Sequence, residues 1–171
     1  MTTRARRNQS QQVFRIGIIA GIIGILVVVG GFFVYFLVDQ GSRQVPLDIP
    51  VYPGAEDWGR ADRSAYSRSV FYRIQNATPE QVADYYTQKL REFSGNSEDE
   101  CIRFPSDGNF LEFDAGTEGV AAYQFVCMFD RSYWSASQYT RVVIQPGAFN
   151  EDPTLNAQGM TVVEYDQNWN P

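Results

Sequence analysis

The sequence predicts an α+β protein: one N-terminal transmembrane helix, then one helix packed on an antiparallel sheet of about five strands. Three observations predict this fold class. A long apolar run stands near the N-terminus, one amphipathic segment follows it, and most of the remaining chain is rich in β-branched and aromatic residues. The 171 residues are enough for one globular domain and a membrane anchor.

The apolar run covers residues 16–38 and contains no charged residue. As a helix it would extend roughly 35 Å and cross a hydrocarbon core of about 30 Å. A cleavable signal peptide is the main alternative, but its apolar core is usually only roughly 7–15 residues long, and a small-residue cleavage motif should follow it. We therefore expect an uncleaved signal anchor that spans the membrane once.

Charge predicts the orientation of the anchor. The arginines that precede the run, with no acidic residue among them, are Arg4, Arg6, Arg7 and Arg15. The positive-inside rule then places the N-terminus in the cytoplasm and the C-terminal domain outside it. The predicted organisation is a cytoplasmic basic tail at 1–15, a transmembrane helix at 16–38, a proline-containing extended stalk at 39–65 and an extracytoplasmic domain at 66–171.

Small residues recur four positions apart along the apolar run. Gly17 and Gly21 form a GxxxG motif, and Ala20 and Gly24 repeat the spacing. Such a stripe lets a second helix approach closely, whether from the same protein or from a partner. Glycine is also common in membrane helices in general, so both interpretations stay open.

One helix of the outer domain has clear start and stop signals. Thr78 is a suitable N-cap, Pro79 suits the first helical position, and Gln81 completes a capping box. The apolar stripe consists of Val82, Tyr86, Leu90 and Phe93. Ser94-Gly95 ends the helix.

The other segments of the domain are strand-like. The sequence predicts strands at 69–74, 101–104, 110–113, 120–130, 139–145 and 160–166. Asp107-Gly108 is a hairpin turn pair between the second and third of these. Cys101 and Cys127 fall in two different strands, and an oxidising compartment would allow a disulfide between them. The alternative is two buried thiols.

Composition excludes several classes of function. The chain contains no histidine, which rules out histidine-dependent catalysis and most zinc, copper and haem sites. A net charge of −6 makes it a poor nucleic-acid binder. Carboxylate pairs such as Glu112 and Asp130 are the remaining catalytic candidates, but no constellation emerges. We predict no enzyme activity, no cofactor and no metal.

Aromatic and arginine residues near predicted strand ends and loops are the candidate interface or ligand-binding residues. Surface tyrosine and tryptophan are typical of protein interfaces and of sugar-binding faces, although a small domain can also bury them as core. The candidates are Trp58, Arg131, Tyr133, Trp134, Tyr139 and Trp169.

Two motifs, DIPVYPGAE at 48–56 and TPEQVADYYTQKL at 78–90, resemble those of uncharacterised bacterial extracytoplasmic domains, which are lipoproteins or single-span proteins. A Gly-Trp often follows the helix in such proteins, and Phe93-Ser94-Gly95 lacks that tryptophan. The resemblance implies a bacterial cytoplasmic membrane and a small α+β domain. It implies no activity and no catalytic residues.

The functional hypothesis is therefore a non-catalytic, membrane-anchored domain that binds protein, as an accessory subunit of a larger membrane complex or as a homo-oligomer. One alternative is a module that binds a cell-wall sugar or another small molecule. A second alternative is a carboxylate-dependent hydrolase.

Overall fold

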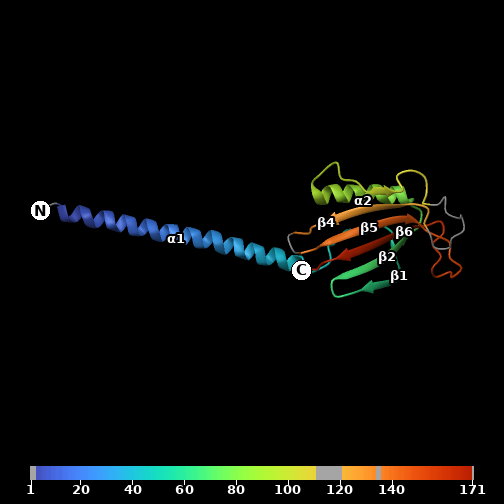
Figure 1. Cartoon of the computed structure of the whole chain (residues 1–171), viewed down its shortest axis with the longest axis horizontal. Coiled ribbons are helices and arrows are strands. Elements are labelled where there is room, and N and C mark those ends of the chain that lie inside the picture. Colours follow the sequence, from blue (N-terminus) through green and yellow to red (C-terminus); the bar gives the residue numbers. More distant parts are fainter. Residues whose placement is uncertain (1–2, 111–120, 134–135, 171) are drawn as a thin grey trace. The chain divides into compact units, whose positions relative to one another are not determined.

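The computed structural model describes residues 3–110, 121–133 and 136–170. The chain divides into two compact units, Met1–Ser42 and Arg43–Pro171. The first unit is the single helix α1 (Thr3–Ser42), and the second contains one further helix and a sheet (Figure 1).

Helix α1 includes one stretch, Gly17–Ser42, that is long and apolar enough to cross a membrane. Its described side chains are exposed up to Val38. The glycines of the GxxxG stripe lie in this stretch, and a Cβ added at Gly17, Gly21 or Gly24 would meet open space. The predicted apolar helix is thus confirmed, and it continues beyond position 38 to Ser42.

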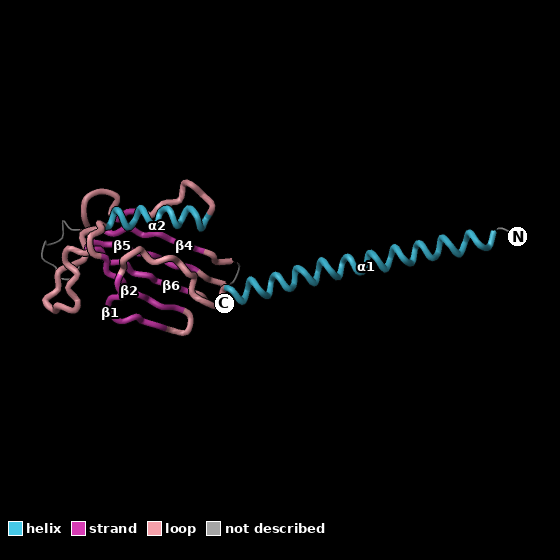
Figure 2. The backbone as a smooth tube through the Cα atoms, turned by 180° about the vertical axis from the view of Figure 1, so that it is seen from behind, coloured by secondary structure: helices cyan, strands magenta, loops and turns pink. Residues whose placement is uncertain are grey.

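The described part of the second unit contains six strands in the order β1-β2-β6-β5-β4-β3, with every neighbouring pair antiparallel. Figure 2 shows β1, β2, β6, β5 and β4 side by side beneath α2. The strands are β1 (Glu56–Arg63), β2 (Ser67–Ile74), β3 (Ile102–Phe104), β4 (Gln124–Asp130), β5 (Tyr139–Pro146) and β6 (Thr161–Asn168). The prediction of about five strands was too small. The strand expected at 110–113 lies largely outside the described residues.

Strand β1 is the additional strand, and its sequence EDWGRADR carries no alternating apolar pattern. Among the described strands it pairs only with β2, and Arg73 of β2 forms a 3.2 Å ion pair with Glu56. An edge strand of this kind tolerates charged side chains because one side of it faces solvent. The register shifts between Trp58 and Asp62, where Gly59 has a φ of 76°. Such a conformation favours glycine and marks a bulge.

Helix α2 (Pro79–Ser94) begins and ends as the sequence predicts. Thr78 Oγ1 accepts from Gln81 N, and the Gln81 side chain accepts from Thr78 N, so both halves of the capping box are present. Gly95 closes the helix in the left-handed conformation. Val82 and Tyr86 are fully buried against the sheet, and α2 covers one of its two faces (Figure 1).

We expect Thr78→Ala to lower the free energy of unfolding by about 1 kcal/mol, because the Gln81 N–H at the helix start loses the hydroxyl oxygen that accepts its hydrogen bond. Chemical denaturation followed by circular dichroism measures this change. Thr78→Ser is the matched control, since it keeps the hydroxyl and should cost much less. An equal loss in both variants would contradict a role for the cap.

The segment 39–65, expected as a stalk, contributes to the folded unit from Arg43 onward. Leu47 and Ile49 are buried, with 9% and 5% of their surface exposed. The Leu47 carbonyl accepts from Gln167 Nε2 at 2.7 Å and from Thr140 Oγ1 at 3.2 Å. The residues after α1 are therefore held against the sheet and not free in solvent.

Two buried tyrosines hold the next part of this segment. Tyr165 donates from its hydroxyl to the Pro50 carbonyl at 3.0 Å, and Tyr86 accepts from Tyr52 N at 3.0 Å. The two hydroxyls lie 2.8 Å apart. Burial raises the pKa of Tyr86 to about 12 and raises that of Tyr165 as well, so both remain protonated donors.

The predicted disulfide is present between Cys101 and Cys127. It joins the residue that precedes β3 to the middle of β4. Phe125, Cys127 and Phe129 share the face of β4 that packs into the core, as the alternation of the strand predicts.

Candidate functional site

The sheet register brings several loops together at one end of the domain. In the strand-pairing register Asn168 lies opposite both Ser67 and Tyr139, and Tyr139 lies opposite Asp130. Trp169 N donates to the Tyr66 carbonyl at 2.9 Å, which joins the β1–β2 turn to the C-terminal segment. We name this region the anchor end, since the chain enters the domain there. Its residues are Arg43, Val45, Arg63, Tyr66, Arg68, Arg131, Tyr133, Tyr139 and Trp169.

Arg43 joins the entry segment to the β4–β5 loop. Its guanidinium lies 5.6 Å from the centre of the Tyr133 ring, in cation–π geometry. Arg43 Nη1 also donates to the Arg131 carbonyl. Next to it, Gln138 Nε2 donates to the Val45 carbonyl at 2.9 Å. These contacts fix the first residues after α1 to the domain.

Large side chains at the anchor end are exposed to solvent. Tyr133 is 60% exposed, Tyr66 is 50% exposed and Val45 is 54% exposed. Arg63 and Arg131 are exposed as well. Exposed aromatic and arginine side chains on one surface are typical of binding surfaces, because both kinds of side chain combine apolar area with a polar group.

Four of the six candidate residues predicted from sequence meet at the anchor end. They are Arg131, Tyr133, Tyr139 and Trp169. Trp58 does not join them. It stands on β1, where it pairs with Phe71 of β2, and its indole N–H donates to the Thr154 carbonyl at 3.0 Å. Trp134 lies outside the described residues.

The second notable surface is the sheet face opposite α2, which we name the open face. In the strand-pairing register Phe71, Glu164, Val143 and Val126 lie side by side across four strands. Val143 is almost fully buried, whereas the other three are partly exposed. The row continues to exposed Ile102 at the β3 edge.

Exposed apolar side chains gather at the β3–β4 side of the open face. Ile102 is 57% exposed, and Met128 is 46% exposed. Phe104, on the same face by register, is 44% exposed. Met128 lies opposite Arg141, which forms a 3.0 Å ion pair with Asp166.

Glu164 is the unusual residue of the open face. It makes no hydrogen bond or ion pair within the part of the chain that the structure describes. Burial raises its pKa above the ordinary value for a glutamic acid, and the nearby Asp166 carboxylate raises it further, while Arg141 opposes this. A carboxylate held between Phe71 and Val143 is therefore destabilising when ionised.

We expect Glu164→Gln to raise the melting temperature at pH 7 and to have little effect at pH 4. Because the folded-state pKa is raised above the unfolded value, the penalty is absent below the unfolded pKa, grows between the two pKa values and is fully present above the folded one. Thermal melts at the two pH values measure the difference. Glu98→Gln, at an exposed carboxylate, is the control. A gain that is the same at both pH values would contradict this account.

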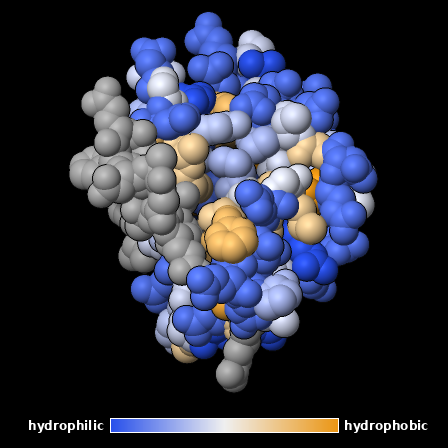
Figure 3. All heavy atoms as spheres, turned by 90° about the vertical axis from the view of Figure 1, so that its right-hand side faces the viewer, coloured by the Kyte–Doolittle hydropathy of each residue, from blue (hydrophilic) through white to orange (hydrophobic). Residues whose placement is uncertain are grey.

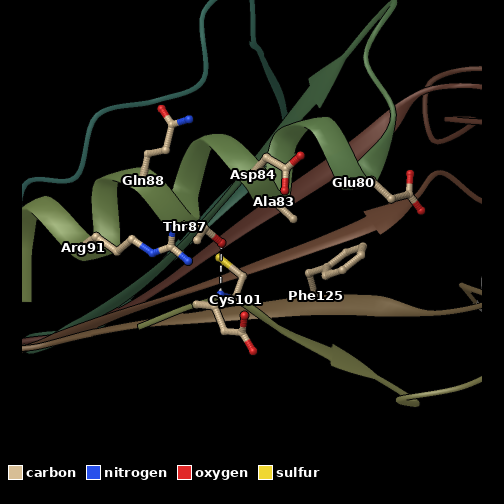
Figure 4. Close-up of a pocket in the computed structure, with 9 residues that line it drawn as sticks. Glu80, Ala83, Asp84, Thr87, Gln88, Arg91, Cys101 and Phe125 are labelled. Carbon is tan, nitrogen blue, oxygen red and sulfur yellow. Dashed lines mark hydrogen bonds between the residues drawn. The ribbon is translucent and has the colours of Figure 1, made fainter. Parts of the chain in front are cut away.

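A groove of about 410 Å³ lies between α2 and the β3–β4 side of the sheet (Figure 4). Its lining residues are Glu80, Ala83, Asp84, Thr87, Gln88, Arg91, Glu100, Cys101 and Phe125. Cys101 is locked in the disulfide, and its backbone N–H donates to Thr87 Oγ1 at 3.1 Å. The groove thus contains carboxylates but no activated nucleophile among its lining residues.

The carboxylate at one end of this groove already has a partner. Tyr123 donates to Glu80 at 2.6 Å, and this hydrogen bond lowers the pKa of Glu80. Burial raises the pKa of Tyr123 to about 12, with the Glu80 bond adding to it. Of the proposed catalytic pair, Glu112 lies outside the described residues, and Asp130 Oδ1 accepts from Ser132 N at 2.7 Å. Among the described residues no three His, Cys, Asp or Glu could hold a metal.

The comparisons with protein-family models, with curated proteins and with solved structures found no match. Function is therefore inferred from the residues themselves. Sequence reasoning missed Arg43, Tyr66 and Glu164. None of them stands in a motif. The alternation of β6 gave the one local signal, because it puts Glu164 on the face of the strand that does not carry the core residues Val163 and Tyr165.

Proposed function

We propose that the chain is a single-pass membrane protein of a bacterial cytoplasmic membrane whose outer domain binds another protein without catalysis. The apolar helix supports the anchor, and four arginines before it support a cytoplasmic N-terminus. The Cys101–Cys127 disulfide supports a domain outside the cytoplasm, because disulfides are rare in a reducing compartment. The bound protein is a subunit of a membrane complex or a second copy of the chain.

The open face is the observation that supports protein binding most directly. It combines exposed Ile102 and Met128 with Glu164, a carboxylate that has no cationic partner of its own in the described residues. A lysine or arginine from another protein would pair with a carboxylate that is already partly desolvated. Such a group gains more from a partner than a fully hydrated one does.

We expect Glu164→Lys to abolish capture of the partner when the tagged full chain is purified from native membranes in mild detergent. The change places like charges together in the interface and should weaken binding at least about tenfold. Ile102→Asp should have a comparable effect, because it puts a charge among apolar contacts. Glu98→Lys, on an exposed loop, makes the same charge change and should leave capture intact.

The outcome also identifies the kind of assembly. Co-purification of other subunits at fixed stoichiometry supports an accessory subunit, and self-association supports a homo-oligomer. A monomer with no companion from native membranes, or equal capture by all three variants, contradicts the proposal.

A further inference from the structure

We propose that the anchor end of the domain is a membrane-docking surface that contacts the headgroups of anionic phospholipids. This inference rests on the membrane anchoring proposed above. It is independent of the open face, which is a different surface of the domain. The observations that support it are the distance along the chain from the anchor, the kinds of side chain that the anchor end exposes, and the distribution of charge.

The chain leaves little distance between the anchor and the domain. The apolar run ends at Val38, and Arg43, five residues later, already contacts Tyr133 and the Arg131 carbonyl. Five helical residues extend only about 8 Å. The headgroup region on each side of a bilayer is roughly 5–8 Å thick. With Val38 at the edge of the hydrocarbon core, Arg43 and the residues bound to it therefore reach the headgroup level.

The anchor end exposes the side chains that suit this level. Tyrosine and tryptophan are enriched where a membrane meets water, because one part of each ring system is apolar and another can hydrogen-bond. Tyr66 and Tyr133 are at least half exposed here, and Trp169 is partly exposed. Arg63 and Arg131 are exposed beside them, and an arginine near an anionic surface contributes about 1 kcal/mol of attraction.

The charge of the domain is strongly asymmetric. Residues 43–171 contain ten Lys and Arg and nineteen Asp and Glu, a net charge of −9. Four of the ten cations are at the anchor end, namely Arg43, Arg63, Arg68 and Arg131. An anionic bilayer repels most of this domain and attracts that end, so electrostatics orients the domain with the anchor end toward the lipid. The acids nearest in the strand register, Asp62 and Asp130, reduce the attraction without cancelling it.

The opposite end of the sheet differs in character. The view of Figure 3, from the end where β2 stops and α2 begins, shows a mainly hydrophilic described surface with small, separated apolar groups. Two exposed large apolar residues, Phe149 and Leu155, belong to the β5–β6 loop at this end. Residues 147–159 contain no arginine, and the arginines that the register places at this end contact its own side chains: Arg73 forms an ion pair with Glu56, and Arg103 stacks on the Tyr123 ring.

Tryptophan quenching in the full chain tests the proposal. Two single-tryptophan variants keep Trp169 at the anchor end or Trp58 on β1, with the other two tryptophans changed to phenylalanine. Each is reconstituted into vesicles of phosphatidylcholine, with or without phosphatidylglycerol, that carry a nitroxide on a fraction of headgroups. We expect quenching of Trp169 to increase roughly twofold when phosphatidylglycerol is present, and to return to the neutral-lipid level at high salt.

A second variant removes positive charge from the anchor end by combining Arg43→Gln, Arg63→Gln and Arg131→Gln. In this charge variant the quenching of Trp169 should no longer depend on phosphatidylglycerol. The matched control is Arg73→Gln with Arg91→Gln and Arg141→Gln, which removes the same charge elsewhere and should keep the dependence. Salt and lipid titrations of the otherwise unmodified chain give the same information if the charge variant does not fold.

The results separate this proposal from the proposed function. Trp169 quenching that is independent of lipid charge, salt and the three arginines overturns the docking surface, even if carbonate extraction shows that α1 is inserted. The docking surface is also overturned if lipid-dependent quenching appears only after a co-purified protein has been removed. That result would mean that an acidic protein, and not lipid, occupies the anchor end. Glu164→Lys should leave the quenching unchanged, so loss of partner binding alone does not affect this test.

Discussion

Replacing Ile49 with alanine is expected to lower the free energy of unfolding of the unit Arg43–Pro171 by about 2–5 kcal/mol. Ile49 is 5% exposed and belongs to the core that α2 and the sheet form, although it stands in a proline-rich segment shortly after α1. Removing its three outer carbons loses buried apolar surface and leaves a cavity. Urea denaturation of the full chain in mild detergent, followed by near-ultraviolet circular dichroism, measures the change.

Val51→Ala is the matched control for this prediction. Val51 stands two residues later and is 38% exposed, so its truncation should cost about 0.5 kcal/mol or less. Equal and small effects at the two positions would mean that residues 43–55 form a solvated stalk after all. The docking surface proposed above would then lose its short connection to the membrane.

The second large effect is expected from the disulfide. Replacing both Cys101 and Cys127 with alanine should lower the free energy of unfolding by about 3 kcal/mol. The bond joins residues 26 positions apart and therefore restricts the unfolded chain. For a domain of this size the melting temperature should fall by roughly 10 °C. Fluorescence or circular dichroism melts of oxidised protein measure the shift.

A reductant provides the control within the same experiment. It should lower the melting temperature of the unmodified chain toward that of the double variant and should not change the double variant itself. If the double variant has the same melting temperature as the oxidised parent, the disulfide does not contribute to stability. If reductant has no effect on the parent, the cysteines are not paired in the purified protein.

Local patterns were sufficient for the two helices. The apolar run needs only its own length and lack of charge to be identified, since a bilayer imposes those requirements on each segment separately. Helix α2 carries its start, its apolar stripe and its end within 18 residues, from Thr78 to Gly95. The core alternation of Phe125, Cys127 and Phe129 was likewise visible, because side chains alternate between the two faces of any strand.

The sequence by itself thus determined the long apolar helix, α2 and most strands, each through a pattern within a few residues. It offered the Cys101–Cys127 disulfide with two buried thiols as the alternative, and the structure decided between them. Only the tertiary structure decided that β1 joins the sheet, because an edge strand is stabilised by its neighbour and not by its own composition. The register likewise brought Arg43, Tyr66 and Trp169 to one end and placed Glu164 between Phe71 and Val143. Pairing between distant strands sets these positions, and no local pattern encodes it.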